Sequence, residues 1–484
     1  MKKTGIILAF VLLLLTIPCF SGCSKSANTR TKYDLVCSYE DGVLTGKEKV
    51  DFYNFTDNAF TELKFNLFGN AFRKDAKYKP ISAQYTARAY PHGLSYGEMT
   101  VETVKQNGEN LQFSIEGEDK NILSVKLLSE LFPEERAVVE ISFTLKLANV
   151  VARTGYNDST VNLGNFYPQL CGIEEDSFYE CVYYSSGDPF YSDCSDYTVR
   201  FTADAKYQVA SSGKVEWEKV SENKKTTCYS IKNARSFALV LSEKFKVATG
   251  SAEGVKINYY YYSDTNPENS VKFAEQSISL FTEKFGEYPY PTYSVVQTEF
   301  VQGGMEYPAL VMISDELEES AYGEVIVHET AHQWWQTTVG NNEVKYGFLD
   351  EGLAEYSVVI FYEEHSEYGM TRKQMITSAE RTYKVFCSVS EKLFGNTDTS
   401  MLRSLGEYKS EYEYVNIAYI KPCVMYEYLR KTIGDAQFFK SLKRYYGSYS
   451  FKNATPDDLV GAFEKTGADT NGFFHSFFEG KAVI

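Results

Sequence analysis

The sequence lacks an apolar run long enough to cross a bilayer as a helix, which takes about 20 residues. Its N-terminal apolar run, from Ile6 to Ile17, is too short. The sequence also lacks internal repeats and low-complexity tracts, so a solenoid is not expected. Its hydrophobic content of 43% and charged content of 24% are ordinary for a soluble protein. These features exclude a polytopic membrane protein and a largely disordered chain.

Basic residues are too few to balance the acids. The 484 residues include 49 Lys and Arg against 65 Asp and Glu, a net charge of −16. Removal of residues 1–22 would take away Lys2 and Lys3 but no acid, which brings the charge to −18. So acidic a chain argues against nucleic acid or anionic lipid as a partner.

Closely paired cysteines are also missing. Apart from Cys19 and Cys23, the chain has seven cysteines, and none of them forms a CxxC pair. No cysteine metal site is therefore expected, and the odd number leaves at least one free thiol. The seven are Cys37, Cys171, Cys181, Cys194, Cys228, Cys387 and Cys423.

The first 22 residues are typical of a secretion signal, because Lys2 and Lys3 precede the short apolar run. The run leads into Phe20-Ser21-Gly22-Cys23, which resembles a bacterial lipobox. We expect residues 1–22 to be a lipoprotein signal peptide, Cys23 to carry a lipid anchor and residues 23–32 to be a tether. The protein would then lie on the outer face of the cell membrane, or on the outer membrane of a Gram-negative cell. The alternative is an ordinary cleaved signal.

The remaining sequence predicts an α+β protein with two domains, in keeping with its length. Residues 33–248 consist of short alternating runs separated by turn pairs such as Asp41-Gly42, which predicts an antiparallel β-domain. Residues 249–484 predict a mainly helical domain after a strand from Val255 to Tyr262. Helices are expected from Pro267 to Phe285 and around 323–338, 350–364, 419–432 and 435–446, with a last one after Thr455.

The clearest chemical signal is the segment VIVHETAHQWW at residues 325–335. His328 and His332 lie four residues apart, so on a helix they project from one face and can share a metal ion. Glu329 lies beside them as the base for an attacking water. A catalytic zinc needs a third protein ligand. Glu351, nineteen residues after His332, is predicted to supply it, and Glu355, one helical turn later, could accept a spare histidine N–H or be a solvated carboxylate.

This spacing resembles the gluzincin aminopeptidases, the family of aminopeptidase N and leukotriene hydrolase, whose pattern is HExxH, eighteen residues, then Glu. The resemblance implies one zinc ion per chain and a thermolysin-like catalytic domain behind a β-domain. The sequence is expected to be a short form without the helical-repeat domain that follows in many relatives.

Two further segments carry the resemblance. Gly303-Gly304-Met305-Glu306-Tyr307 is similar to the family's GxMEN motif, an edge strand whose glutamate holds the substrate's α-ammonium group, although Tyr307 replaces the usual Asn. Gly303, Gly304 and Met305 would line the cleft. Tyr419-Ile420-Lys421-Pro422 is similar to Tyr-x-Lys-Gly, whose tyrosine stabilises the oxyanion.

Some assignments have competitors. Tyr412 and Tyr414 compete with Tyr419 as the oxyanion donor. Gln169, in the segment Asn165-Phe166-Tyr167-Pro168-Gln169, is a candidate neighbour of the amine site. The resulting hypothesis is a zinc aminopeptidase acting on peptides with a free N-terminus. Its alternatives are an endopeptidase with the same zinc site and a catalytically silent, lipid-anchored peptide-binding protein.

Overall fold

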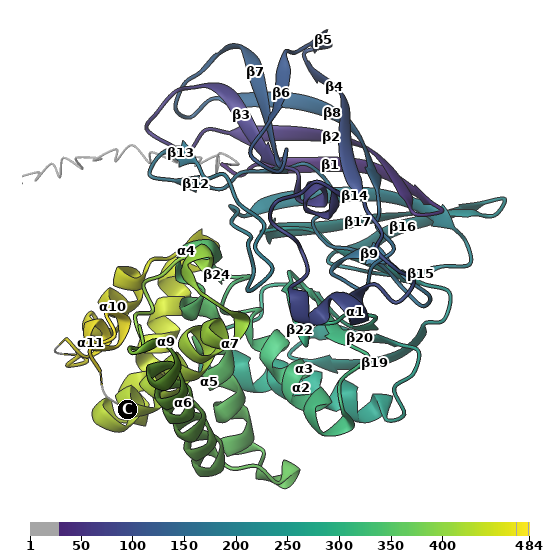
Figure 1. Cartoon of the computed structure of the whole chain (residues 1–484). Helices are drawn as coiled ribbons and strands as arrows, with labels where there is room; N and C mark the ends of the chain where they lie inside the picture. Colours follow the sequence, from purple (N-terminus) through teal and green to yellow (C-terminus); the bar gives the residue numbers. More distant parts are fainter. Residues whose placement is uncertain (1–28, 471, 483) are drawn as a thin grey trace, which may run out of the picture.

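The structure, a computed structural model, describes residues 29–470, 472–482 and 484. The predicted signal peptide, Cys23 and most of the tether lie outside these residues. Strands dominate the first half of the chain and helices the second, as Figure 1 shows. The predicted α+β class is therefore confirmed. Within the described residues, no helix is both long enough and apolar enough to span a bilayer.

An eight-stranded sheet forms the body of the β-domain. Its strand order is β16-β17-β14-β1-β2-β8-β4-β5. All neighbouring pairs are antiparallel except β1 and β14, so one parallel pair interrupts the predicted antiparallel arrangement. In chain order these strands are β1 (Lys32–Glu40), β2 (Val43–Tyr53), β4 (Glu98–Gln106), β5 (Glu109–Asn110), β8 (Arg136–Lys146), β14 (Ser195–Asp204), β16 (Lys214–Ser221) and β17 (Lys224–Ala234).

Smaller sheets complete this half of the molecule. Their orders are β15-β18-β10-β9, β11-β3-β7-β6 and β12-β13. The strands are β3 (Phe60–Asn66), β6 (Phe113–Glu116), β7 (Ile122–Leu131), β9 (Thr154–Tyr156), β10 (Val161–Leu163), β11 (Gln169–Leu170), β12 (Ile173–Glu174), β13 (Ser177–Phe178), β15 (Gln208–Ser211) and β18 (Leu239–Ser242). Short helices are η1 (Phe68–Phe72), η2 (Ala83–Tyr85) and α1 (Thr86–Ala89).

The catalytic half opens with a five-stranded sheet in the order β19-β20-β21-β23-β22. The predicted boundary at residue 249 falls inside its first strand. Because β22 pairs only with β23, the GGMEY segment lies at a sheet edge. The strands are β19 (Lys246–Ala252), β20 (Val255–Tyr261), β21 (Thr292–Thr298), β22 (Gly304–Tyr307) and β23 (Leu310–Ser314); a separate pair is β24 (Val339–Gly340) with β25 (Lys452–Asn453).

Helices make up most of the remaining chain. They are α2 (Pro267–Lys284), α3 (Glu319–Ala331), α4 (Glu343–Tyr346), α5 (Phe348–Glu364), α6 (Arg372–Phe394), α7 (Glu411–Tyr414), α8 (Lys421–Ile433), α9 (Asp435–Tyr449), α10 (Pro456–Glu464) and α11 (Phe473–Phe478). Short 3-10 turns are η3 (Ser366–Tyr368) and η4 (Leu405–Glu407), and a π-helix, η5, covers Val415–Ile420. Helix α6 was not expected from the sequence.

One predicted helix end was wrong. The helix expected around 323–338 ends at Ala331, and Gln336 has a φ of 118°. The two tryptophans turn the chain out of the helix. Trp334 donates its indole N–H to the carbonyl of Gly286, and Trp335 donates to the hydroxyl of Ser357. These buried contacts outweigh the local helix preference.

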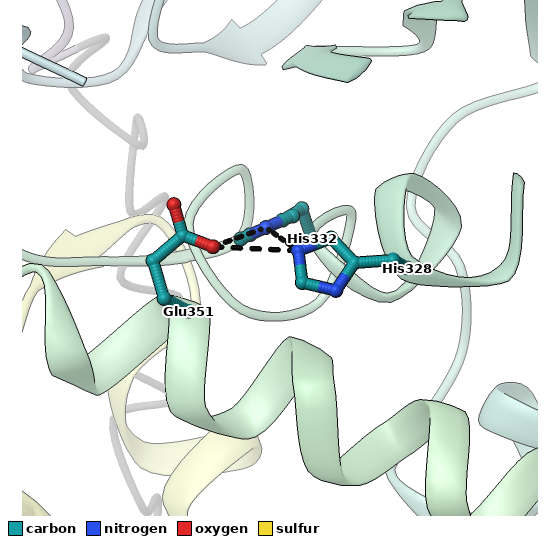
Figure 2. A group of neighbouring side chains, drawn as sticks. All are labelled: His328, His332 and Glu351. Atoms are coloured by element: carbon teal, nitrogen blue, oxygen red, sulfur yellow. Dashed lines mark hydrogen bonds and ion pairs between the residues drawn. The ribbon is translucent and has the colours of Figure 1, made fainter. Parts of the chain in front are cut away.

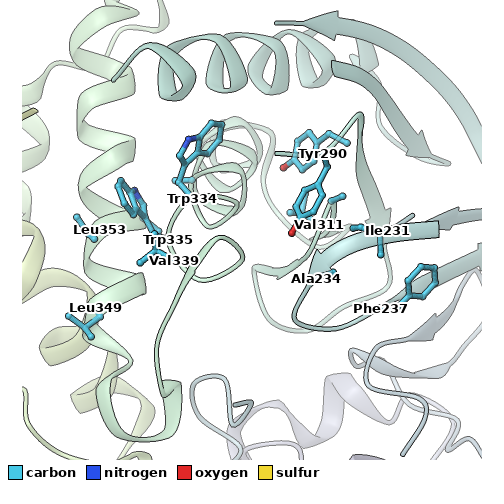
Figure 3. Packing of buried hydrophobic residues seen from close by; sticks show 14 of the residues in the cluster. Ile231, Ala234, Phe237, Tyr290, Val311, Trp334, Trp335, Val339, Leu349 and Leu353 are labelled. Atoms are coloured by element: carbon cyan, nitrogen blue, oxygen red, sulfur yellow. The ribbon is translucent and has the colours of Figure 1, made fainter. Parts of the chain in front are cut away.

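The buried core is continuous between the two halves. Figure 3 shows the two tryptophans beside α5 and, across the same cluster, side chains from the end of β17 and the loop after it. Arg235, in that loop, also joins the halves through hydrogen bonds. Its guanidinium donates to the carbonyls of Gln336 and Lys452, both at 2.6 Å. The loop after α3 and strand β25 are thereby attached to the β-domain.

Candidate active site

Helices α3 and α5 bring the three predicted metal ligands together. Figure 2 shows the carboxylate of Glu351 pointing from α5 toward the rings of His328 and His332 at the end of α3. The Nε2 atoms of the histidines are 3.1 Å apart. Oε2 of Glu351 is 3.3 Å from Nε2 of His328 and 3.2 Å from Nε2 of His332.

These distances fit zinc. Ligand atoms about 2.0–2.1 Å from a tetrahedral ion are about 3.3–3.4 Å from each other, close to the three edges observed here. The other ring nitrogens are held as well. Nδ1 of His328 is 3.3 Å from Oε2 of Glu355, and Nδ1 of His332 is 3.0 Å from the carbonyl of Trp335. Such contacts present Nε2 to the metal. The contact between Glu355 and His328 agrees with the expectation that Glu355 could accept a spare histidine N–H.

Glu329 lies beside the donor group and is buried, and its Oε2 has no hydrogen-bond partner. Burial raises the pKa of this carboxyl to about 7, and the charges of His328 and His332 oppose the shift. The positive charge of a zinc ion would act in the same direction as the histidine charges and lower this pKa. Gly304 allows this arrangement, because a Cβ there would lie 2.2 Å from Oε1 of Glu329.

Tyr419 reaches the site from the π-helix η5. Its hydroxyl donates to Oε1 of Glu351, and its ring stacks on His328 with centroids 5.9 Å apart. The two competing tyrosines are placed differently. Tyr414 is buried and packs edge-on against Tyr419, whereas Tyr412 is 52% exposed and packs against Phe386. Of the three hydroxyls, the one on Tyr419 contacts the donor group.

The edge strand β22 supplies Glu306, whose side chain is only 3% exposed. Carboxylate oxygens of Glu306 and Glu329 and a ring nitrogen of His332 all lie within 4.8 Å of one another. Met305 is also buried, and a Cβ added at Gly303 would meet no atom within 4 Å. Tyr307, which departs from the family motif, is buried and donates its hydroxyl to Oδ1 of Asn165.

Gln169 lies in the same small cavity as Glu306. Its amide is committed elsewhere, because Nε2 donates to the carbonyl of Arg235 at 2.8 Å. Gln169 therefore lies near the edge strand, but its amide N–H is directed at Arg235.

Two residues near the site carried no local signal in the sequence. Asp188, in a loop of the β-domain, forms a buried ion pair with Arg153. Arg153 also donates to the sulfur of Met305. The charge of Asp188 contributes to the raised pKa of Glu306, after the larger effect of burial. The loop reaches the catalytic half only through tertiary packing, for a Cβ at Gly187 would touch Leu405 and Tyr414.

Comparisons with known proteins agree with this geometry. Residues 270–477 match the Peptidase family M1 domain. Aminopeptidase N of Lactococcus lactis subsp. lactis is 24% identical over 274 residues, 51% of this chain and 30% of that protein. Aminopeptidase N of Lactobacillus helveticus is 23% identical over 407 residues, 79% of this chain and 46% of that protein. The matched segments thus span less than half of these relatives.

The fold is that of solved M1 enzymes. The M1 zinc metallopeptidase of Deinococcus radiodurans superposes with a TM-score of 0.68 at 16% identity, covering 94% of this chain and 95% of that one. A structure described as a two-domain M1 zinc metallopeptidase, bound to L-tryptophan, has a TM-score of 0.65 at 16% identity and the same coverage. Residues 270–477 are therefore similar to the Peptidase family M1 domain, and the His-His-Glu donor group lies within this matched segment.

Proposed function

We propose that this protein is an aminopeptidase, which removes N-terminal residues from peptides. The position of Glu306 is the observation that carries the proposal. Its carboxylate lies within 4.8 Å of ligating atoms of Glu329 and His332. A peptide whose α-ammonium group is bound by Glu306 would therefore have its first peptide bond beside the zinc ligands.

The residues around this bond have distinct tasks. When bound, the zinc ion supplies Lewis acidity, which makes water a stronger acid and a carbonyl a better electrophile. Glu329 removes a proton from the attacking water and passes it to the leaving amine. Tyr419 rotates its hydroxyl from Glu351 to the developing oxyanion. Glu355 and the Trp335 carbonyl keep the two histidine rings in place.

The names of the relatives support the same proposal. Both curated relatives above are called aminopeptidase N. A variant of the Deinococcus radiodurans enzyme was solved with a Tyr-Ser-Ala substrate. These are properties of those proteins, and for this chain the specificity has to be measured.

A blocked and a free form of one peptide test the proposal. We expect the zinc-loaded protein to cleave the first bond of the free peptide and to leave its N-acetylated form intact. Equal cleavage of both would favour the endopeptidase alternative. Cleavage of neither, with zinc bound, would favour the silent binding protein.

Glu329→Gln controls for a contaminating peptidase. The substitution removes the base but keeps nearly the same shape, so activity should fall by about 10²- to 10⁴-fold while one zinc per chain remains. Wild-type activity in this variant would show that Glu329 is not the base.

We further propose that the protein is exported and attached to the outer face of a bacterial membrane through a lipid on Cys23. The proposal rests on the lipobox-like residues that precede this cysteine. Expression with a labelled fatty acid should label the wild type. Cys23→Ser should remove the label and release the protein from the membrane fraction; labelling that persists in this variant would rule out the anchor.

A further inference from the structure

A second group of three acidic side chains lies beside the zinc ligands, and two of the three have no task in the proposed reaction. Ligating atoms of Glu306, Glu343 and Asp350 are all within 4.8 Å of one another, and all three residues are buried. They come from β22, α4 and α5, so the tertiary structure assembles them. Glu306 is shared with the zinc side of the cleft, but Glu343 and Asp350 are not.

Positive charge that would balance these carboxylates is missing. Within residues 29–470, 472–482 and 484, no lysine or arginine forms an ion pair with any of the three. Arg235 lines the same cavity as Glu306 and Glu343. However, its N–H groups are taken by the carbonyls of Gln336, Ser192 and Lys452 and by the side chain of Asn453.

Hydrogen bonds do not compensate either. Both carboxylate oxygens of Glu343 and Oε1 of Glu306 are buried without a hydrogen-bond partner. Of the three groups, only Asp350 accepts a bond of normal geometry, from Nδ2 of Asn341 at 2.9 Å. Glu343 itself is 3% exposed. A buried carboxylate aimed at two others and left unpaired is costly, and it indicates that something positively charged belongs between them.

Burial raises the pKa of Glu343 well above its usual value, and the charges of Asp350 and Glu306 raise it further, whereas the side chain of Gln336 partly opposes the shift. Protons are therefore one way to neutralise the group. A bound cation is the other, and it leaves Glu306 ionised, the form that can accept hydrogen bonds from an ammonium group.

The size of the site favours a single ion. The cavity lined by Glu306 and Glu343, though not by Asp350, has a volume of about 20 Å³, room for about one water-sized particle and too little for an amino-acid side chain. Opposite oxygen ligands of Ca²⁺ lie about 4.6–5.2 Å apart, and those of Mg²⁺ about 4.0–4.2 Å. Donor atoms that lie within 4.8 Å of one another can surround an ion of either kind.

We propose that Glu306, Glu343 and Asp350 bind a hard divalent cation such as calcium or magnesium, next to the zinc site but distinct from it. Oxygen-only donors favour such ions over zinc, which prefers nitrogen and sulfur ligands. The inference concerns metal binding and does not depend on the proposed peptidase specificity.

Titration of the zinc-loaded protein with CaCl₂ tests the site. We expect calorimetry to detect one calcium ion per chain in addition to one zinc, and calcium to raise the melting temperature. MgCl₂ and MnCl₂ provide comparison arms. Glu343→Gln should weaken calcium binding at least tenfold and abolish the rise in melting temperature, while the zinc content stays at one per chain.

Glu48→Gln is a matched control. Glu48 is another buried carboxylate without a hydrogen-bond partner, but it lies in β2. This variant should bind calcium like the wild type. The proposal is overturned if wild-type protein binds none of the three ions at millimolar concentration, if Glu343→Gln binds calcium as tightly as the wild type, or if the second ion that binds is zinc. Hydrolysis of the free peptide without calcium reports separately on the proposed function.

Discussion

The proposed role of Tyr419 as oxyanion donor can be tested by removing one oxygen atom from its side chain. Tyr419→Phe removes the hydroxyl but preserves the ring that stacks on His328. Loss of one oxyanion donor should lower kcat by about 10²- to 10³-fold. The zinc content should not change, because the histidines and Glu351 are intact.

The exposed Tyr412 offers a control for this prediction. Its ring packs against Phe386, and it does not contact the zinc ligands. Tyr412→Phe should therefore keep the wild-type kcat. If Tyr419→Phe also kept it, the oxyanion donor would have to be another group.

Glu48 is the one acidic side chain on the buried face of β2, where the neighbouring inward positions include Leu44 and Val50. Burial raises its pKa well above the usual value. The folded state therefore binds this proton more tightly than the unfolded state. The resulting stability is present below the unfolded pKa, about 4.3, and is lost as the pH rises through the folded value.

Glu48→Gln removes this titration. We expect the variant and the wild type to have similar free energies of unfolding near pH 4, and the variant to be more stable at pH 7 by roughly 1–3 kcal/mol. Urea unfolding at both pH values measures the difference. Equal stability of the two proteins at both pH values would mean that Glu48 finds a partner or water in solution.

At the scale of elements, the start of helix α10 is stabilised by a capping box formed by two nearby residues. Thr455 accepts a hydrogen bond from the N–H of Asp458, and the Asp458 carboxylate accepts one from the N–H of Thr455. Thr455→Ala should reduce stability by about 1 kcal/mol. Because both residues belong to one capping box, Thr455→Ala and Asp458→Ala combined should cost less than the sum of the single effects. Additive costs would show that the two bonds act independently.

The element that carries Tyr419 behaves differently. Val415–Ile420 is a π-helix between two α-helical segments. Such segments are rare and occur often at functional sites. The spacing of apolar residues predicts a helix here but does not reveal the wider turn, which changes the direction in which Tyr419 points.

For the whole molecule, Arg235 joins the β-domain to the catalytic half. Its bonds to Gln336 and Lys452 are buried or partly buried. Arg235→Gln should lower the free energy of unfolding by at least about 3 kcal/mol, because hydrogen bonds from charged groups contribute about 1.5–3 kcal/mol each.

The measurement is calorimetry of the zinc-loaded protein. We expect the thermal unfolding transition of Arg235→Gln to be broadened or split in two, because the two halves would lose part of their coupling. Arg444→Gln, which changes an exposed arginine on α9, serves as the control for loss of charge. Comparable destabilisation by both substitutions would show that the interdomain bonds are not responsible.

Zinc removal also acts on the whole molecule. A ligand that binds only the folded state stabilises it by about 2.7 kcal/mol at 100 times its dissociation constant. Chelation should therefore lower the melting temperature as well as the activity, and added zinc should restore both. Restored activity without a change in melting temperature would contradict binding of zinc to the folded core.

The sequence alone determined the three candidate metal ligands and the class of fold. His328 and His332 are four residues apart, so their approach depends on local helix geometry, and Glu351 follows nineteen residues after His332 at the start of α5. The alternation of buried residues in strands such as β2 and the apolar periodicity of α2 are local in the same sense.

Only the tertiary structure decided which distant residues join that group. Glu306 meets His332 because an edge strand packs beside α3, and Asp188 approaches through a loop of the other domain. The end of α3 depends on where Trp334 and Trp335 are buried. Glu343 joins Asp350 and Glu306 for the same reason: such contacts depend on how separate elements pack, and spacing along the chain carries no information about packing.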